Sequence, residues 1–198
     1  RWPRHLMKLV GPINHWRTDP SGWIGSVVML GFAWIAAWRW QSSGLLFYAL
    51  TFLRDLAAGW FLLARRRDMA KVQFGLGDML AYVSSALPLL YFSPSVGSSA
   101  NTLLASNVMA IFGFTIVTVA LFELGPSFGV SPANRGAVKS GVYALVQHPM
   151  YIGYVVSELG LCILNLWNMV FLATSIVLYL MRGCLEGAVL RLRVDSKL

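Results

Sequence analysis

The chain has 198 residues, of which 57% are hydrophobic and only 12% are charged. A soluble domain of this length exposes much of its chain to water and carries more charge than this. The composition therefore excludes an ordinary soluble domain and predicts a single all-α domain embedded in a membrane. The net charge of +8 is also typical of nucleic-acid binders, so the position of the basic residues has to be considered next.

Apolar segments in six places predict a polytopic protein with about six transmembrane helices. A helix rises about 1.5 Å per residue, so about 20 residues cross the hydrocarbon layer of about 30 Å. Four segments each predict one span: 22–38, 44–64, 74–92 and 101–122. The last run, 150–181, is long enough for two short tilted spans. Asn165-Leu-Trp167 interrupts this run and predicts a C-terminal helical hairpin, with the tryptophan at the membrane interface.

The lysines and arginines are distributed unequally between the two sides of these spans. Fourteen lie before span one, between spans two and three, between spans four and five, or after span six, whereas the opposite loops carry Arg39 alone. The positive-inside rule then predicts that both termini are cytoplasmic, in what we expect to be a bacterial inner membrane. Membrane topology and contact with anionic lipid explain the basic excess, so we expect no nucleic-acid partner.

The segment that leads into span five carries the first candidate site. It reads Gly141-Val-Tyr-Ala-Leu-Val-Gln-His-Pro-Met-Tyr-Ile-Gly153 and overlaps the end of a long cytoplasmic stretch, 123–149. Pro149 suits the first turn of a helix, where its missing N–H would have no partner. His148 then lies beside the free N–H groups at the helix start, which attract anions.

Three further residues of this segment could contact a ligand. Tyr143 and Tyr151 offer aromatic faces for a cation, and Gly153 allows a ligand or another backbone to approach closely. An ordinary helix entry with interfacial tyrosines is the alternative interpretation.

A second candidate site lies where span six leaves the membrane. Arg182 and Glu186 are four residues apart and share one helix face. A snorkelling arginine paired with a glutamate would be an ordinary explanation. However, spans five and six form a hairpin, so His148 and Arg182 are expected at the same membrane face. This convergence favours a functional site.

These motifs resemble the isoprenylcysteine carboxyl methyltransferase family. The resemblance depends on Tyr143-Ala-Leu-Val-Gln-His-Pro-Met-Tyr-Ile-Gly153, the apolar hairpin, and Arg182-x-x-x-Glu186-x-x-x-Leu190, and it covers residues 123–190. The stretch Ser127–Gly136 is similar to the bacterial members. The family includes many bacterial membrane methyltransferases and is related to phospholipid methyltransferases.

The resemblance implies methyl transfer from S-adenosyl-L-methionine to a lipophilic acceptor that reaches the site from the bilayer. Arg182 would bind the carboxylate of the cofactor, and Glu186 its ribose hydroxyls or amino group. A carboxylate acceptor would need no general base, because holding both reactants in line supplies most of the rate enhancement. No metal is expected. The implied cofactor-binding residues are Tyr143, Val146, Gln147, His148, Pro149, Tyr151, Gly153, Arg182 and Glu186.

Two positions depart from the family's pattern. The family usually has arginine directly before His-Pro, where this chain has Gln147, so a fixed positive charge is lost. The family also usually has a second glutamate and then a tyrosine-containing tail, whereas Gly187 follows Glu186 here. Both differences concern cofactor affinity or the choice of acceptor.

Besides the two candidate sites, charged residues within the apolar runs are a third indication of function. A charge at mid-membrane costs about 2.5–3.5 kcal/mol, so Arg54, Asp55, Asp78 and Glu158 should face the bundle and find partners. Adjacent helix residues point about 100° apart, so Arg54 is not expected to pair with Asp55, and by depth we expect it to pair with Glu158. Such a pair is either structural or holds the polar head of the acceptor. The candidate catalytic residues are therefore Arg54, Glu158, Arg182 and Glu186.

Two other functions are compatible with parts of this pattern. Sterol-type membrane reductases have a similar fold and a related His-Pro-x-Tyr signature, but an NADPH-dependent enzyme would need a phosphate site, and no extended basic cluster surrounds His148. A non-catalytic channel or transporter would explain the intramembrane charges, but these do not form a line across the bilayer.

Overall fold

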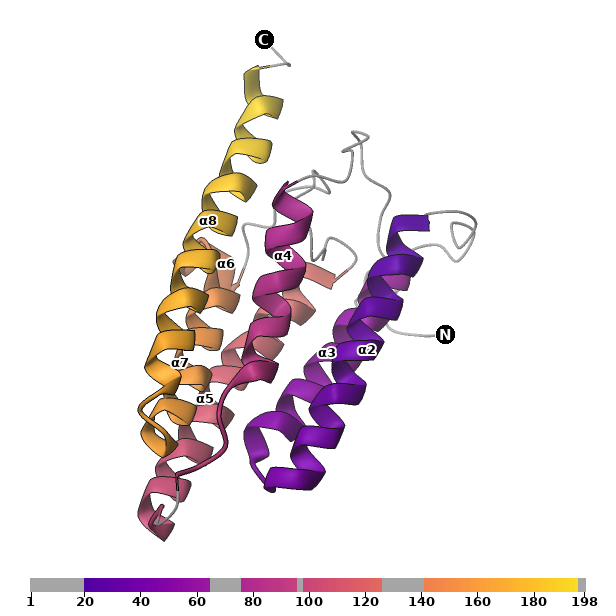
Figure 1. Cartoon of the computed structure of the whole chain (residues 1–198). Helices are drawn as coiled ribbons and strands as arrows, with labels where there is room; N and C mark the ends of the chain where they lie inside the picture. Colours follow the sequence, from indigo (N-terminus) through magenta and orange to yellow (C-terminus); the bar gives the residue numbers. More distant parts are fainter. Residues whose placement is uncertain (1–19, 65–75, 96–97, 126–140, 196–198) are drawn as a thin grey trace, which may run out of the picture.

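The structure is a computed structural model that describes residues 20–64, 76–95, 98–125 and 141–195. These residues form helices and turns, with no strand among them, which confirms the predicted all-α class. The long helices run side by side as a bundle (Figure 1). The elements are α2 (Pro20–Ser43), α3 (Leu46–Ala64), α4 (Leu76–Ala86), the 3₁₀-helix η2 (Leu87–Leu90), α5 (Ala100–Leu124), α6 (Val142–Leu145), α7 (Pro149–Leu164) and α8 (Asn168–Asp195).

Four of these helices, α2, α3, α5 and α8, are long and apolar enough to cross a membrane. Their outer faces carry large exposed hydrophobic side chains, for example Trp34, Ile111 and Val170. Exposed apolar surface of this extent belongs in lipid, so the chain is an integral membrane protein. Helices lie at all six predicted places, but α7 has only 16 residues and α4 only 11, so the predicted count of six spans is not confirmed.

The third predicted span is shorter than its apolar run suggested. The run covers 74–92, but of its described residues, 76–92, only those of α4 are α-helical, and the chain continues as η2. Pro88 is the physical reason, because it lacks an N–H and its ring disturbs the preceding turn of an α-helix. Asp78 lies in the first turn of α4, where a helix favours negative charge.

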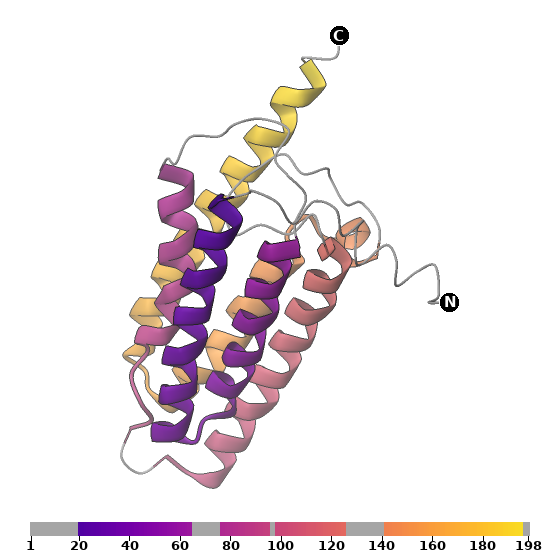
Figure 2. The ribbon, with the colours of Figure 1, turned by 90° about the vertical axis from the view of Figure 1, so that its right-hand side faces the viewer.

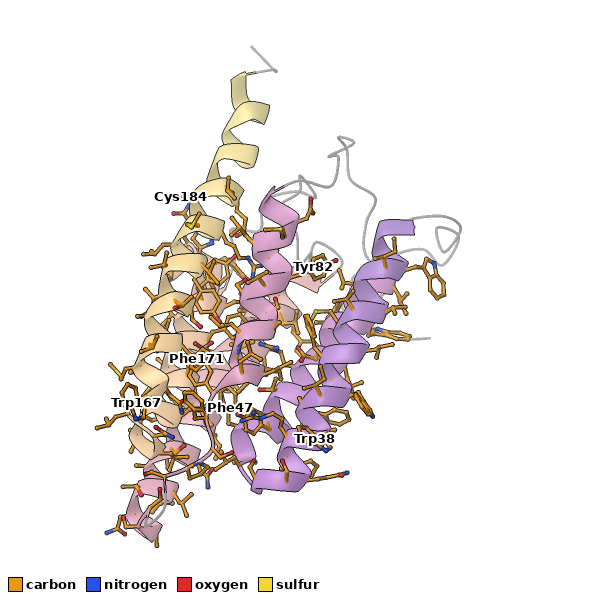
Figure 3. All side chains as sticks on the ribbon, viewed as in Figure 1. Trp38, Phe47, Tyr82, Trp167, Phe171 and Cys184 are labelled. Atoms are coloured by element: carbon orange, nitrogen blue, oxygen red, sulfur yellow. The ribbon has the colours of Figure 1, made fainter. Side chains whose placement is uncertain are left out.

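The predicted C-terminal hairpin is confirmed. The chain turns between α7 and α8, where the Asn165 side chain accepts a hydrogen bond from the backbone N–H of Trp167 at 3.1 Å. Trp167 is 74% exposed. It lies on the outside of the bundle near the same end as Trp38 and away from Cys184 (Figure 3). This position suits a tryptophan at the membrane interface.

Small residues bring α5 and α7 into close backbone contact. A Cβ added to Gly153 would lie 2.6 Å from the carbonyl oxygen of Gly113, and a Cβ on Gly160 would lie 2.8 Å from that of Ser106. Small residues of this kind let membrane helices approach closely. The backbone of α5 therefore takes the close approach that the sequence predicted at Gly153 for a ligand or another backbone. The contact also fixes the position of the start of α7.

The two ends of the bundle can be followed in Figures 1 and 2. At one end, which we call the α6 end, α5 ends, α7 begins and α8 continues beyond the other helices. The turn between α7 and α8 lies at the opposite end, which we call the turn end. The basic segments on which the predicted orientation mainly depends, within 1–19, 65–75 and 126–140, lie outside the described residues, so this orientation stays a prediction.

Candidate functional site

The start of α7 has the form that the sequence predicted. Pro149 is the first helical residue and His148 precedes it as the N-cap residue. The His148 side chain makes no capping hydrogen bond. Instead its Nδ1 atom lies 3.5 Å from Oε2 of Glu186, on α8. The segment before α7 and the exit of α8 therefore meet at the α6 end, as the hairpin predicted.

Three side chains surround the carboxylate of Glu186. Besides His148, the Tyr151 hydroxyl donates a hydrogen bond of 2.5 Å to Oε1, and the NH2 group of Arg182 lies 3.8 Å from the same oxygen. The Glu186 side chain is 24% exposed. The cluster of His148, Tyr151, Arg182 and Glu186 is the candidate site, and we call it the α6-end cluster.

Arg182 is the most deeply placed cation of this cluster. It is only 7% exposed, and its NH1 group donates a hydrogen bond of 2.9 Å to Oγ of Ser84, on α4. Its guanidinium carbon lies 5.2 Å from the ring centre of Tyr151, within the range of a cation–π contact. The sequence predicted that Tyr151 could hold a cation, and in the structure Arg182 itself takes this place.

Aromatic rings connect the α6-end cluster to the bundle interior. The ring centres of His148 and Tyr151 lie 5.3 Å apart, as do those of Tyr151 and Tyr179, and both pairs are stacked. Tyr154 follows at 5.6 Å from Tyr179. These separations are typical of packed aromatic pairs, so the rings form a continuous wall rather than an open cage.

The short helix α6 is attached to the end of α5 by a carboxylate. Glu123 accepts a hydrogen bond of 2.9 Å from the backbone N–H of Val142, at the start of α6. Gly141, which precedes it, has φ of +57°, and a Cβ there would lie 1.9 Å from the Glu123 carboxylate. Both observations require glycine at this position. The contact fixes where the chain re-enters the bundle before His148.

The predicted ligand residues in and just after α6 are more exposed than Arg182 of the α6-end cluster. Val146 and Gln147 are exposed, and Tyr143 is half-buried. Burial raises the pKa of the Tyr143 hydroxyl above its usual value, and the nearby Tyr154 and Glu186 raise it further, so this hydroxyl stays protonated at neutral pH. Their proposed role in cofactor binding stays a prediction.

Glu158 lies in a separate cluster in the bundle interior. It is 1% exposed, and its two oxygens accept hydrogen bonds from the Tyr91 and Tyr179 hydroxyls at 2.7 and 2.6 Å. The direct Arg54–Glu158 ion pair predicted from depth is therefore wrong. Depth along two helices does not determine which way each side chain points. Here the hydroxyls of two tyrosines, rather than Arg54, bond to the Glu158 carboxylate.

Arg54 pairs instead with its neighbour Asp55, against the prediction. Its Nε and NH2 groups donate to Oδ1 of Asp55 at 2.8 and 2.6 Å. The Cβ atoms of adjacent residues do point apart, but the long arginine side chain bends back to the neighbouring carboxylate. The guanidinium also lies 5.2 Å from the ring centre of Tyr154. Both charges are thus neutralised within α3.

Two residues of the site were not identified from the sequence. A Cβ at Gly183 would lie 3.3 Å from Nε2 of His148, so this glycine lets His148 lie against α8. The sequence offered one indication of this role. A glycine inside a helix costs about 1 kcal/mol in stability relative to alanine, so its presence usually has a packing reason. Ser84 gave no such signal, because only the packing of α4 on α8 brings it to Arg182.

Comparison with known proteins agrees with the predicted resemblance. The model of the isoprenylcysteine carboxyl methyltransferase (ICMT) family matches residues 104–187, which include most of α5, all of α7 and the four residues of the α6-end cluster. No curated protein and no solved structure matches the chain. Over these residues the chain is therefore similar to the isoprenylcysteine carboxyl methyltransferase family, which is a family of methyltransferases.

Proposed function

We propose that the protein transfers a methyl group from S-adenosyl-L-methionine to a lipophilic acceptor and binds this cofactor at the α6-end cluster. The observation that carries the proposal is the convergence of His148, Tyr151 and Arg182 on Glu186, within the stretch that matches the methyltransferase family. The cofactor offers a carboxylate, an ammonium group and a ribose diol, and it supplies the methyl group from a sulfonium.

The donor and acceptor set of the cluster fits these groups. Arg182, His148 and the Tyr151 hydroxyl are hydrogen-bond donors that already face one carboxylate, that of Glu186. A ligand carboxylate could use the same donors through charge-assisted bonds. Glu186, which is partly exposed, can accept from an ammonium group or from ribose hydroxyls. The cluster would thus bind and orient the cofactor at the α6 end.

The interior residues contribute differently in this proposal. Glu158 and Arg54 were candidate catalytic residues. However, the carboxylate of Glu158 and the guanidinium of Arg54 are already hydrogen-bonded to other side chains within the bundle. These contacts favour a structural role, in which the two clusters hold α3, α7, η2 and α8 together. The acceptor would approach from the bilayer, and orientation of the two reactants would supply most of the rate enhancement.

Calorimetric titration of the detergent-purified protein tests the proposal directly. S-adenosylhomocysteine should bind, and NADPH, titrated separately, should not. His148→Ala and Arg182→Ala should each weaken S-adenosylhomocysteine binding about ten- to a hundredfold, because each removes a charge-assisted hydrogen bond. Cys184→Ala is the control, since Cys184 is exposed on α8 between Arg182 and Glu186. Binding of NADPH alone would overturn the proposal, and unchanged affinity in both variants would move the site elsewhere.

We also propose that the α6 end faces the cytoplasm, where the cofactor is made. The unequal distribution of basic residues supports this orientation. Cysteines introduced at the exposed Ser93 and Ala144, in a Cys184→Ser background, report on the two ends of the bundle. A membrane-impermeant thiol reagent applied to intact cells should label position 93 and not 144. Labelling of both positions, or of 144 alone, would contradict the orientation.

A further inference from the structure

The helix α4 lies outside the stretch that matches the methyltransferase family, yet it contacts the α6-end cluster through one side chain. Ser84 is fully buried, and its Oγ accepts the hydrogen bond of 2.9 Å from NH1 of Arg182. The same hydroxyl donates its hydrogen to the backbone carbonyl of Ala81 at 2.9 Å. Ser84 thus connects the backbone of α4 to the deepest cation of the cluster.

The two hydrogen bonds of Ser84 fix the direction of its hydroxyl. A serine hydroxyl has one hydrogen to donate and two lone pairs to accept with. Because the hydrogen is directed to Ala81, three residues earlier in the helix, a lone pair is left for the guanidinium. A buried serine in this state is an acceptor of fixed direction, and acceptor bonds to a charged donor are stronger than neutral ones.

An acceptor on NH1 determines where the rest of the guanidinium points. The group is planar, so fixing one terminal nitrogen restricts rotation of the whole fork. The ring of Tyr151 lies 5.2 Å from the guanidinium carbon and restricts it further. NH2 then lies on the side of Glu186, 3.8 Å from Oε1. In this arrangement the NH2 group faces the position at which the cofactor's charged groups would bind.

We propose that Ser84 is a positioning residue for Arg182, and that α4 thereby completes the cofactor site. This inference rests on the proposed function, because it assigns Ser84 a role in the binding of S-adenosylmethionine. Ser84 acts through Arg182 and does not itself touch the cofactor. Without the Ser84 hydroxyl, Arg182 keeps its charge but loses this acceptor for NH1.

The test compares Ser84→Ala with Ser85→Ala. Ser85 is a matched control, because its hydroxyl donates to the same Ala81 carbonyl at 2.9 Å. Ser84 differs from Ser85 in that its hydroxyl also accepts a hydrogen bond from Arg182. The dissociation constant of S-adenosylhomocysteine and the melting temperature are measured for both variants. Ser84→Ala should weaken binding about three- to tenfold, less than Arg182→Ala, because the guanidinium stays in place and only its orientation is loosened, and Ser85→Ala should leave binding within about twofold.

A double variant separates positioning from a general effect on the fold. If Ser84 acts only through Arg182, adding Ser84→Ala to Arg182→Ala should not weaken binding further. Equal affinities of Ser84→Ala and Ser85→Ala would overturn the inference, even if the melting temperature of Ser84→Ala falls. Additive losses in the double variant would overturn it as well. Failure of the unaltered protein to bind S-adenosylhomocysteine would instead overturn the proposed function, so the two failures are distinguishable.

Discussion

The regions around the two buried arginines, Arg54 in α3 and Arg182 in α8, contain similar groups in different arrangements. The two residues are 8% and 7% exposed, and each guanidinium lies 5.2 Å from the centre of a tyrosine ring. Arg54 makes two short hydrogen bonds to Asp55, the next residue of its own helix. Arg182 is bonded to another helix through Ser84 and lies 3.8 Å from a partly exposed carboxylate, that of Glu186.

The difference shows that burial of a charge does not by itself identify a ligand site. Arg54 and Asp55 neutralise each other inside the bundle, so that region needs no ligand to balance its charges. At the α6 end the carboxylate of Glu186 is shared by three side chains and reaches solvent. It can change partners when a ligand with its own carboxylate arrives. The exposure of the acidic partner distinguishes the two regions better than that of the arginine.

The largest effect is expected from breaking the interior ion pair. Asp55→Asn leaves Arg54 charged in a buried position, so it should lower the free energy of unfolding by about 3–5 kcal/mol. The double variant Arg54→Gln/Asp55→Asn should lose much less than the sum of the single changes, because it leaves no isolated charge. Thermal and denaturant unfolding in detergent measure both quantities.

The result for Glu158 sharpens this test. Since Glu158 bonds to tyrosines, we expect Arg54→Gln and Glu158→Gln to be nearly additive. Strong coupling between Arg54 and Glu158, together with additive losses for Arg54 and Asp55, would contradict the pairing in the structure.

The fold could be predicted largely from local rules, whereas the site could be predicted only in part. Helices at the apolar runs, the hairpin at Asn165 and the helix start at Pro149 follow from chain-local chemistry and are found, although the count of six spans is not confirmed. The end of the α-helical part of α4 was missed because Pro88 lies inside an apolar run. The partners of Arg54 and Arg182 depend on helix rotation and on which helices pack together, and neither depth nor spacing determines these.

The second expected effect concerns the interior carboxylate. Tyr179→Phe removes one of the two hydroxyls that bond to the buried carboxylate of Glu158, at 2.6 Å. A hydrogen bond to a charged group contributes about 1.5–3 kcal/mol, so the free energy of unfolding should fall by that amount. Tyr91→Phe removes the other hydroxyl and should behave alike. A loss below about 0.5 kcal/mol in both variants would indicate that water replaces the hydroxyls and that this region is not closed.

The third effect compares two glycines, one between helices and one beside the α6-end cluster. Gly153→Ala places a methyl group 2.6 Å from a backbone oxygen of α5, so the helices must separate, at a cost of about 1–3 kcal/mol in stability. Gly183→Ala meets only the side chain of His148, at 3.3 Å, which can shift. It should leave stability within about 0.5 kcal/mol and change ligand affinity. Similar unfolding losses in the two variants would contradict this comparison.

A small change in stability is expected from Tyr151→Phe, which makes the same chemical change as Tyr179→Phe at the other carboxylate. The Tyr151 hydroxyl bonds to Glu186 at 2.5 Å, but the Glu186 side chain is 24% exposed, so water can replace the lost donor. We therefore expect a loss of less than about 1 kcal/mol in unfolding free energy. The ring remains in place for Arg182 and His148, so the stack should persist.

Glu186 loses the hydroxyl that orients it, so S-adenosylhomocysteine should bind about two- to fivefold more weakly. Stability and affinity, measured on the same preparation, give opposite orders for the two tyrosines: Tyr179→Phe should mainly reduce stability, and Tyr151→Phe should mainly reduce affinity. Equal stability losses with no change in affinity for Tyr151→Phe would mean that the α6-end cluster is a structural contact like the interior one.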